Sequence, residues 1–118
     1  MGVVYHANYL VWCEVGRTDL IRALGVSYAD IERAGIGLAV VEANLRYKRG
    51  ARYDEQIQVV TTVAKVRSRS VTFAYDIALL DGTLLAQAYT ALAAVGPDGR
   101  STSIPPALRQ AMERAIET

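Results

Sequence analysis

The sequence contains few of the side chains that most often carry chemistry, with one cysteine, one histidine, one tryptophan and one phenylalanine among 118 residues. The lone Cys13 cannot form an intramolecular disulfide, which favours a reducing compartment and predicts a cytoplasmic protein. A single histidine with a single cysteine cannot supply the four ligands of a usual zinc site. The sequence therefore predicts neither a metal nor another cofactor.

An excess of charge and a long apolar run are absent as well. The chain has 13 basic and 12 acidic residues, whereas a nucleic-acid-binding domain usually has a basic excess. The most apolar stretch, residues 84–95, is interrupted by Gln87 and Thr90 and is shorter than the roughly 20 residues of a membrane-spanning helix. The first residues lack the basic and apolar regions of a signal peptide. We expect no nucleic acid partner and no membrane insertion.

The composition of the chain, 52% hydrophobic over 118 residues, predicts one globular domain spanning residues 1–118. Residues 9–24 have helical periodicity and end at Gly25, a favourable residue after a helix. Apolar residues lie on two sides of this helix, so we expect it to be covered on more than one flank. They are Leu10, Cys13, Leu20, Ile21 and Leu24 on one side, and Val11, Trp12 and Val15 on the other. A short helix over residues 27–34 follows, capped by Ser27.

After Gly37 the apolar period becomes 2, which predicts strands over residues 39–48, 56–66, 70–80 and 83–95. In the first strand we expect Ala39, Val41, Ala43, Leu45 and Tyr47 to share a face, and in the third Val71, Phe73, Tyr75, Ile77 and Leu79. Asp81-Gly82 is typical of a two-residue type I′ turn. A closing helix is predicted from Pro105 to Ile116. The order of elements predicts an α+β fold with an antiparallel sheet around the long helix.

Two segments are candidates for chemistry. In the opening residues "MGVVYHANY", Gly2 allows a close backbone approach and the chain then enters a helix N-terminus, whose free N–H groups can hold a developing oxyanion. The alternative is a structural loop with Val3 and Val4 in the core. In "KVRSRSVTF", basic side chains alternate with hydroxyls, which suits phosphate groups; the alternative is a solvated hairpin. We interpret Cys13 as a core residue, and Glu14 and Arg17 can form a pair at a surface or interface.

The segments "GVVYHANYLVWCEVGRTDLIRALG", "VVEANLRYKRGARYDE" and "VRSRSVTFAYDIAL" resemble the 4-hydroxybenzoyl-CoA thioesterase family of the hotdog fold. The resemblance covers nearly the whole chain. It implies an acyl-CoA thioesterase that forms homodimers or homotetramers, with its active sites at the dimer interface. It also implies that backbone N–H groups near Tyr5 and His6 polarise the thioester carbonyl. Substrate-binding residues would be Gly2, Val3, Val4 and Tyr9, with Arg67, Ser68, Arg69 and Ser70 near the CoA phosphates.

The sequence departs from the family pattern at its start. The family's catalytic carboxylate lies three residues before the motif glycine, and this position precedes Met1. The first strand of the fold also lies outside the sequence. We expect either that the protein begins further upstream or that it is a shortened homologue, and we favour the first because loss of that strand exposes a sheet edge. If the chain is complete, His6 would orient water or substrate, with Tyr5 or Tyr9 beside it.

Three functions remain open from the sequence. The leading hypothesis is hydrolysis of an acyl-CoA thioester, without a cofactor. The second is a non-catalytic hotdog protein that binds acyl-CoA or an acyl carrier, or acts as a scaffold. A hydratase is the weakest, because no Asp lies near His6 in the sequence. The acyl group cannot be predicted from the sequence.

Overall fold

A computed structural model describes residues 6–49 and 55–117, without the side chains of residues 6–8, 28 and 117. The long helix α1 (His6–Ala23) is followed by the short helix α2 (Tyr28–Arg33). Four strands come next, and helix α3 (Pro106–Glu117) closes the chain. The strands are β1 (Gly37–Tyr47), β2 (Ile57–Val66), β3 (Ser70–Leu79) and β4 (Leu84–Val95). Each expected element is present, with bounds within three residues of those predicted.

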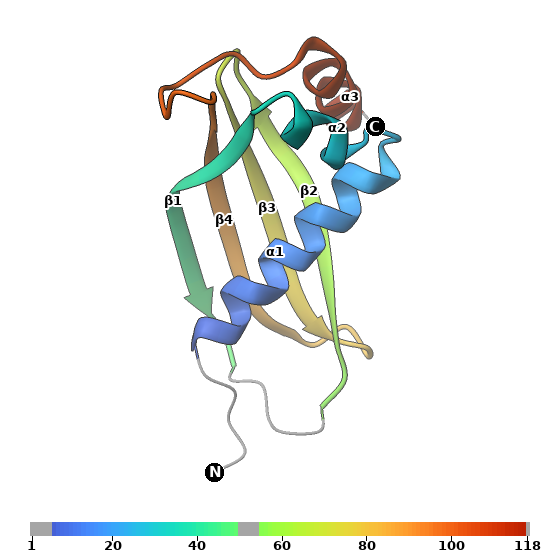
Figure 1. The fold of residues 1–118 in the computed structure, drawn as a ribbon. Helices are drawn as coiled ribbons and strands as arrows, with labels where there is room; N and C mark the ends of the chain where they lie inside the picture. Colours follow the sequence, from blue (N-terminus) through green and yellow to red (C-terminus); the bar gives the residue numbers. More distant parts are fainter. Residues whose placement is uncertain (1–5, 50–54, 118) are drawn as a thin grey trace.

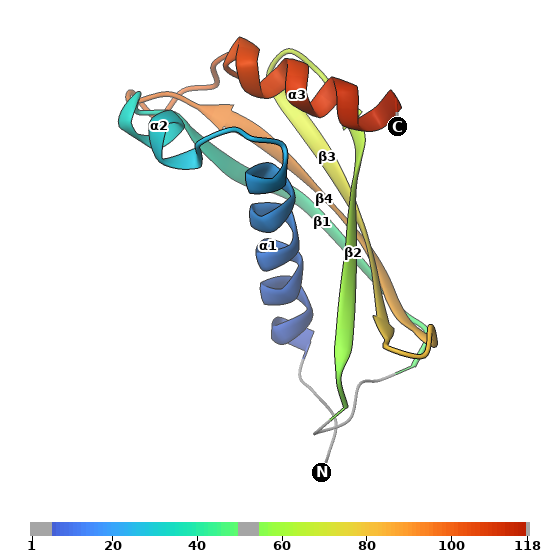
Figure 2. The same cartoon turned by 90° about the vertical axis from the view of Figure 1, so that its right-hand side faces the viewer.

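The four strands form one antiparallel sheet in the order β1-β4-β3-β2, so β1 and β2 are its edges. Helix α1 crosses one face of this sheet diagonally (Figure 1). Helices α1 and α2 lie on the same side, and α3 lies across the end where the β2–β3 hairpin turns (Figure 2). The α+β architecture expected from the sequence is confirmed. No helix within the described residues is long and apolar enough to cross a membrane.

The core lies between α1 and the sheet face that it covers, which we call the inner face. From the sheet it takes Val71, Phe73, Tyr75 and Ile77, each at most 2% exposed. These are alternating residues of β3, as the period-2 pattern predicts. Helix α1 contributes Tyr9, Cys13 and Ile21, and α3 adds Leu108 and Met112. Cys13 is fully buried, which confirms its interpretation as a core residue.

One flank of α1 differs from the expectation. Within one protomer the second flank is not covered by the described residues, because Val11 and Val15 are 52% and 54% exposed. Leu10, which we expected in the core-facing stripe, is 38% exposed. A helix on an open sheet buries one stripe, and its other apolar residues remain in solvent unless another surface covers them.

Two local predictions about strand geometry are wrong. The Asp81-Gly82 pair does not form a two-residue turn. Gly82 N–H donates to Leu79 O (3.0 Å), so Leu80 and Asp81 occupy the centre of the turn and Gly82 follows with φ 95°. In β1, a bulge between Val40 and Glu42 inserts Val41 as an extra residue. Residues before the bulge therefore change face, and Ala39 lies on the opposite face from Ala43.

The cap of the second helix follows the prediction. Ser27 is the N-cap of α2, and its Oγ accepts a hydrogen bond from the backbone N–H of Asp30. Gly35, just after the helix, has φ 81°, a conformation that glycine adopts without strain. These local signals position α2 between α1 and the first strand.

Candidate active site

The start of α1 is the first half of the candidate site. The helix begins at His6, and its first turn contains no acidic residue. The partial positive charge of the free N–H groups is therefore not offset by a carboxylate on the helix itself. Such a terminus can stabilise negative charge that develops on a carbonyl oxygen.

Aromatic side chains fix this end of the helix on the sheet. Tyr9 is fully buried. Its ring lies 4.9 Å from that of Trp12 and 5.0 Å from that of Tyr47 on β1, both in edge-to-face geometry. Edge-to-face pairs at this distance are favourable. The start of α1 is thereby held next to the end of β1.

The remaining predicted residues of this half cannot be placed. Gly2, Val3, Val4 and Tyr5 lie outside the described residues, and so does the side chain of His6. The predicted roles of His6 and Tyr5 therefore stay predictions. Tyr9 is the one predicted side chain of this segment that the structure describes.

The hairpin between β2 and β3 contains the second predicted segment, residues 67–70. Its backbone is held by three hydrogen bonds: Arg67 N–H to Ser70 O (2.8 Å), Ile104 N–H to Ser68 O (2.8 Å) and Ala94 N–H to Arg69 O (2.9 Å). The side chains of Arg67, Ser68 and Arg69 are exposed. Neither arginine forms an ion pair with a described residue, although Arg69 donates to Ser101 O. A fixed backbone with exposed basic side chains that form no ion pair suits an anionic group.

The two halves lie at opposite ends of the sheet within one protomer. The start of α1 lies beside Tyr47, where β1 ends, and the 67–70 hairpin lies at the other end of β3 (Figure 1). Strands β2 and β3 have 10 residues each. At about 3.3 Å per residue, the halves are separated by roughly 30 Å along the strands. One protomer alone does not bring the two predicted segments together.

A buried polar chain between α1 and the sheet was not predicted. The Tyr75 hydroxyl lies 2.7 Å from Thr90 Oγ1, and Arg17 Nη1 donates to the Tyr75 hydroxyl at 3.3 Å. Arg17 forms no ion pair with Glu14 or any other described residue, so the suggested pairing within the helix is not formed. The sequence feature that could have indicated this contact is a tyrosine and a threonine at strand positions that point into the core.

Cys13 is unsuited to act as a nucleophile. Burial raises the pKa of its thiol from 9.0 to about 11, against the opposing effect of the nearby Arg17 cation. The thiolate is the reactive form, so a thiol that stays protonated at neutral pH is inert. Nor do three or more His, Cys, Asp or Glu side chains gather at any point of the described residues in a way that could hold a metal ion.

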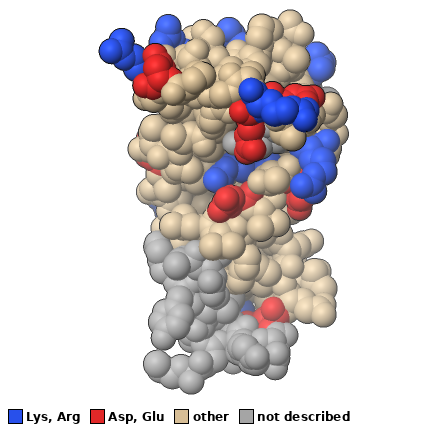
Figure 3. All heavy atoms as spheres, viewed as in Figure 1, with Lys and Arg blue, Asp and Glu red and all other residues tan. Residues whose placement is uncertain are grey.

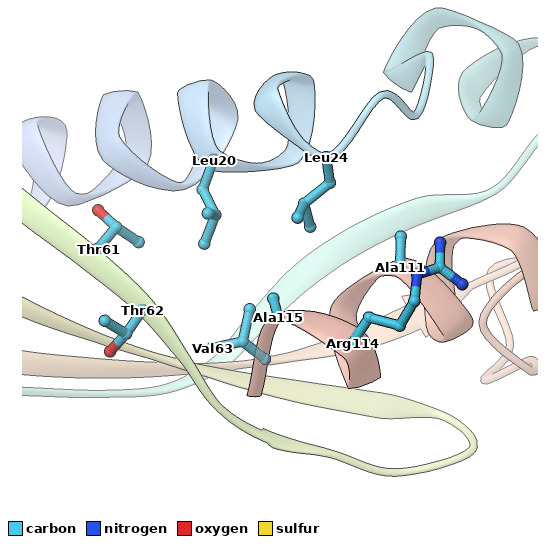
Figure 4. Close-up of a pocket in the computed structure, with 8 residues that line it drawn as sticks. All are labelled: Leu20, Leu24, Thr61, Thr62, Val63, Ala111, Arg114 and Ala115. Carbon is cyan, nitrogen blue, oxygen red and sulfur yellow. The ribbon is translucent and has the colours of Figure 1, made fainter. Parts of the chain in front are cut away.

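A cavity of about 450 Å³ lies away from both halves, between α1, β2 and α3. Figure 4 shows Leu20 and Leu24 of α1 pointing towards Val63 of β2, with Ala115 of α3 beside it. Thr61 Oγ1, also on its wall, is buried and has no hydrogen-bond partner within the described region. On the face drawn in Figure 3, basic and acidic side chains lie side by side without a continuous patch of either sign.

The fold and the sequence comparisons together identify the family of this protein. The family model of the Thioesterase-like superfamily matches residues 1–112, and the chain belongs to this family. Its fold is the hotdog fold, as the resemblance implied. The crystal structure of DHNA-CoA thioesterase from Staphylococcus aureus superposes with a TM-score of 0.89 at 34% identity, over 99% of this chain and 81% of the other.

Among sequence relatives, the chain is 46% identical over 77 residues to YneP of Bacillus subtilis, which carries the provisional name of acyl-CoA thioesterase. This match covers 65% of the chain and 56% of YneP. The acyl-CoA thioester hydrolase YbgC of Escherichia coli is 29% identical over 96 residues, which are 81% of this chain and 72% of that protein. The chain thus spans little more than half of the length of YneP.

Proposed function

We propose that the protein is an acyl-CoA thioesterase, which hydrolyses a thioester to a free acid and CoA. The observation that carries this proposal is the start of α1, where no acidic side chain of the first turn opposes the positive end of the helix. Water adds to the carbonyl carbon, the carbonyl oxygen becomes negative, and the backbone N–H groups stabilise it. The carbon–sulfur bond then breaks, and the CoA thiolate takes up a proton. Membership of the Thioesterase-like superfamily supports this chemistry.

The side-chain roles follow the sequence predictions. His6 and Tyr5 would orient the water or the substrate, with the backbone of Gly2, Val3 and Val4 beside the acyl group. Tyr9 would act through packing, because its buried ring fixes the start of the helix. Arg67, Ser68, Arg69 and Ser70 would bind the phosphates of CoA; the exposure of Arg67 and Arg69, and the absence of an ion pair between either one and a described residue, support this role.

We further propose a homodimer in which the β1 edges of two protomers pair antiparallel. Val40, Val41 and Tyr47 on this edge are 49%, 65% and 44% exposed, and a second chain would cover such apolar side chains. The exposed Val11 and Val15 of α1 would be covered by the same partner. The domain would act as a single unit, and its free, buried Cys13 is consistent with the cytoplasm.

Antiparallel pairing also joins the two halves of the site. A two-fold axis at the β1 edge inverts the second protomer, so its 67–70 hairpin comes to the end at which α1 of the first protomer begins. The hairpin belongs to β3, the third strand from this edge. The lateral separation between β1 of the first protomer and β3 of the second is then about three strand spacings, roughly 14 Å. Each site would take its helix from one protomer and its phosphate-binding residues from the other.

The test is thiol release from a panel of acyl-CoA substrates, made with the 118-residue chain and with a version extended upstream to include an Asp three residues before Gly2. The double variant Arg67→Ala/Arg69→Ala should raise KM for acyl-CoA about tenfold, with no change for an acyl-pantetheine thioester, which lacks the nucleotide phosphates. Arg22→Ala/Arg33→Ala is the matched control, because both arginines are exposed and lie on helices. CoA binding without thiol release by either chain would overturn the proposal and indicate a non-catalytic binder.

A further inference from the structure

A groove of about 590 Å³ lies where the chain enters α3, apart from the two halves of the candidate site. Its apolar part is formed by Ile36, Ile104, Pro105 and Pro106. Ile104 is buried and Pro106 is exposed. A volume of this size is ordinary for the binding site of a small molecule. The two prolines have a fixed backbone φ, so this wall is rigid and loses little entropy when a ligand binds.

Polar side chains of α3 form the rest of the groove. Arg109 Nε donates a hydrogen bond to Glu113 Oε1 at 2.8 Å, and this ion pair orients the guanidinium group. Gln110 lines the groove beside Arg109. Its side chain is exposed, and its carboxamide has no hydrogen-bond partner within the described part of the chain. The groove therefore offers a planar cation and a carboxamide next to an apolar wall.

The groove adjoins the 67–70 hairpin, which lies at the end of the sheet that α3 crosses (Figure 2). The backbone N–H of Ile104, which lines the groove, donates to Ser68 O at 2.8 Å. The guanidinium of Arg69 donates to Ser101 O at 3.4 Å. Three residues of extended chain span at most about 11 Å, so Ser101 and Ile104 cannot be further apart. An anion bound by Arg69 would consequently lie close to the groove.

We propose that this groove binds the adenine base of CoA. The inference rests on the proposed function, which assigns the phosphates of CoA to the 67–70 hairpin. In CoA a single ribose joins the base to the diphosphate, and the same ribose carries the 3′-phosphate. The base must therefore lie close to the residues that bind the phosphates, and the groove provides a hollow at that place.

The side chains of the groove suit a purine. A guanidinium plane stacks on the face of a base, and the ion pair with Glu113 already orients the guanidinium of Arg109. A glutamine carboxamide recognises adenine through two hydrogen bonds, one accepted from the N6 amine and one donated to N7. Gln110 has the required group and no competing partner among the described residues. The pantetheine arm of CoA has no planar ring that could stack on Arg109.

The charge of Glu113 is compatible with this ligand. Its carboxylate is paired with Arg109, which offsets the negative charge. Adenine is uncharged at neutral pH, so the base can lie beside this pair without repulsion. The phosphates, which a carboxylate would repel, are assigned to the exposed Arg67 and Arg69 instead. The groove and the hairpin thus divide the nucleotide into a neutral part and an anionic part.

Calorimetric titration with CoA and with its hypoxanthine analogue, which differs from CoA in the base alone, tests the inference. Hypoxanthine has a carbonyl oxygen in place of the N6 amine and cannot form both hydrogen bonds with Gln110. We expect the native chain to bind the analogue about tenfold more weakly than CoA. Gln110→Leu should weaken CoA binding about tenfold and abolish the preference between the two ligands. Arg109→Ala should weaken both ligands equally, by about threefold, because stacking does not depend on the base edge.

Arg114→Ala is the matched control, because Arg114 is an exposed arginine of the same helix that does not line the groove. Its Kd for both ligands should equal that of the native chain, and circular dichroism verifies that each variant is folded. A native chain without base preference, or a Gln110→Leu chain that keeps the preference, would overturn the inference. So would equal weakening of 4′-phosphopantetheine by Gln110→Leu, which would indicate that the groove holds the pantetheine arm.

The failure of this inference can be told apart from that of the proposed function. Loss of the base preference together with thiol release from acyl-CoA would overturn the adenine site and leave the thioesterase proposal standing. A base preference that depends on Gln110, without thiol release by either chain, would support the adenine site and overturn hydrolysis. No binding of CoA at all would overturn the adenine site and the phosphate assignment together.

Discussion

Replacement of Tyr75 by phenylalanine tests whether the buried polar chain ties α1 to the sheet. The Tyr75 hydroxyl lies 2.7 Å from Thr90 Oγ1 and accepts a hydrogen bond from Arg17 at 3.3 Å. Tyr75 and Thr90 are each 2% exposed. Tyr75→Phe would leave Thr90 Oγ1 without a hydrogen-bond partner among the described residues. An orphaned buried polar group costs about 1–3 kcal/mol, and the half-exposed Arg17 adds little because solvent screens it. We therefore expect a loss of about 2 kcal/mol in the free energy of unfolding.

A second substitution, Thr90→Val, separates the contribution of the hydrogen bond to stability from the effect of a change in side-chain volume. Thr90→Val alone should cost about 1 kcal/mol, because it leaves the Tyr75 hydroxyl with one partner fewer. In Tyr75→Phe/Thr90→Val both polar groups are gone, and the total loss should be about 1 kcal/mol smaller than the sum of the single losses. The assay is urea unfolding at one fixed protein concentration, since association shifts apparent stability. Equal m-values would show that the unfolded states are comparable. Losses that add within about 0.3 kcal/mol would refute the coupling.

Three further predictions concern the interior. Thr61→Val should raise stability by about 1 kcal/mol in urea unfolding, because it removes a buried hydroxyl without a partner; unchanged or lower stability would contradict this. Gly16→Ala should lower stability by about 1–3 kcal/mol, because a Cβ at Gly16 would overlap Thr61 Oγ1, and the loss should shrink when Thr61 is replaced by alanine. Burial raises the pKa of the Cys13 thiol from 9.0 to about 11 in the folded chain. The unfolded chain therefore loses this proton first, and stability should fall as pH rises from 9 to 11. Cys13→Ala should reduce that slope in unfolding series at each pH.

Much of the fold follows from local patterns in the sequence. The alternation of Val71, Phe73, Tyr75 and Ile77 predicts the inner face of β3, and these residues are buried. Ser27 predicts the cap of α2, and its hydroxyl accepts the expected kind of hydrogen bond. Such features depend on the residues within one element, so a single segment contains the information.

The parts that were missed depend on contacts between elements. The chain of Arg17, Tyr75 and Thr90 joins residues that are 58 and 15 positions apart. The turn at Asp81-Gly82 was mispredicted because the same dipeptide also fits a turn in which only the glycine has positive φ, as Gly82 has. For the site, the sequence identified two segments but could not show that they lie at opposite ends of the sheet, since their separation depends on which strands pair.

The bulge at Val41 determines which side chains of β1 lie on each face of the sheet. Strict alternation through β1 would place Ala39 on the inner face with Ala43, and Leu38 on the outer face, which points away from α1. The extra residue reverses the faces upstream of it, so Leu38 pairs with Ala94 on the inner face and Ala39 with Ala93 on the outer face. Leu38 consequently packs against the buried core, at the place that the smaller Ala39 would otherwise take. The outer face receives the small Ala39 instead. One inserted residue thus lets β1 contribute Leu38 to the interior, which strict alternation would have left on the opposite face.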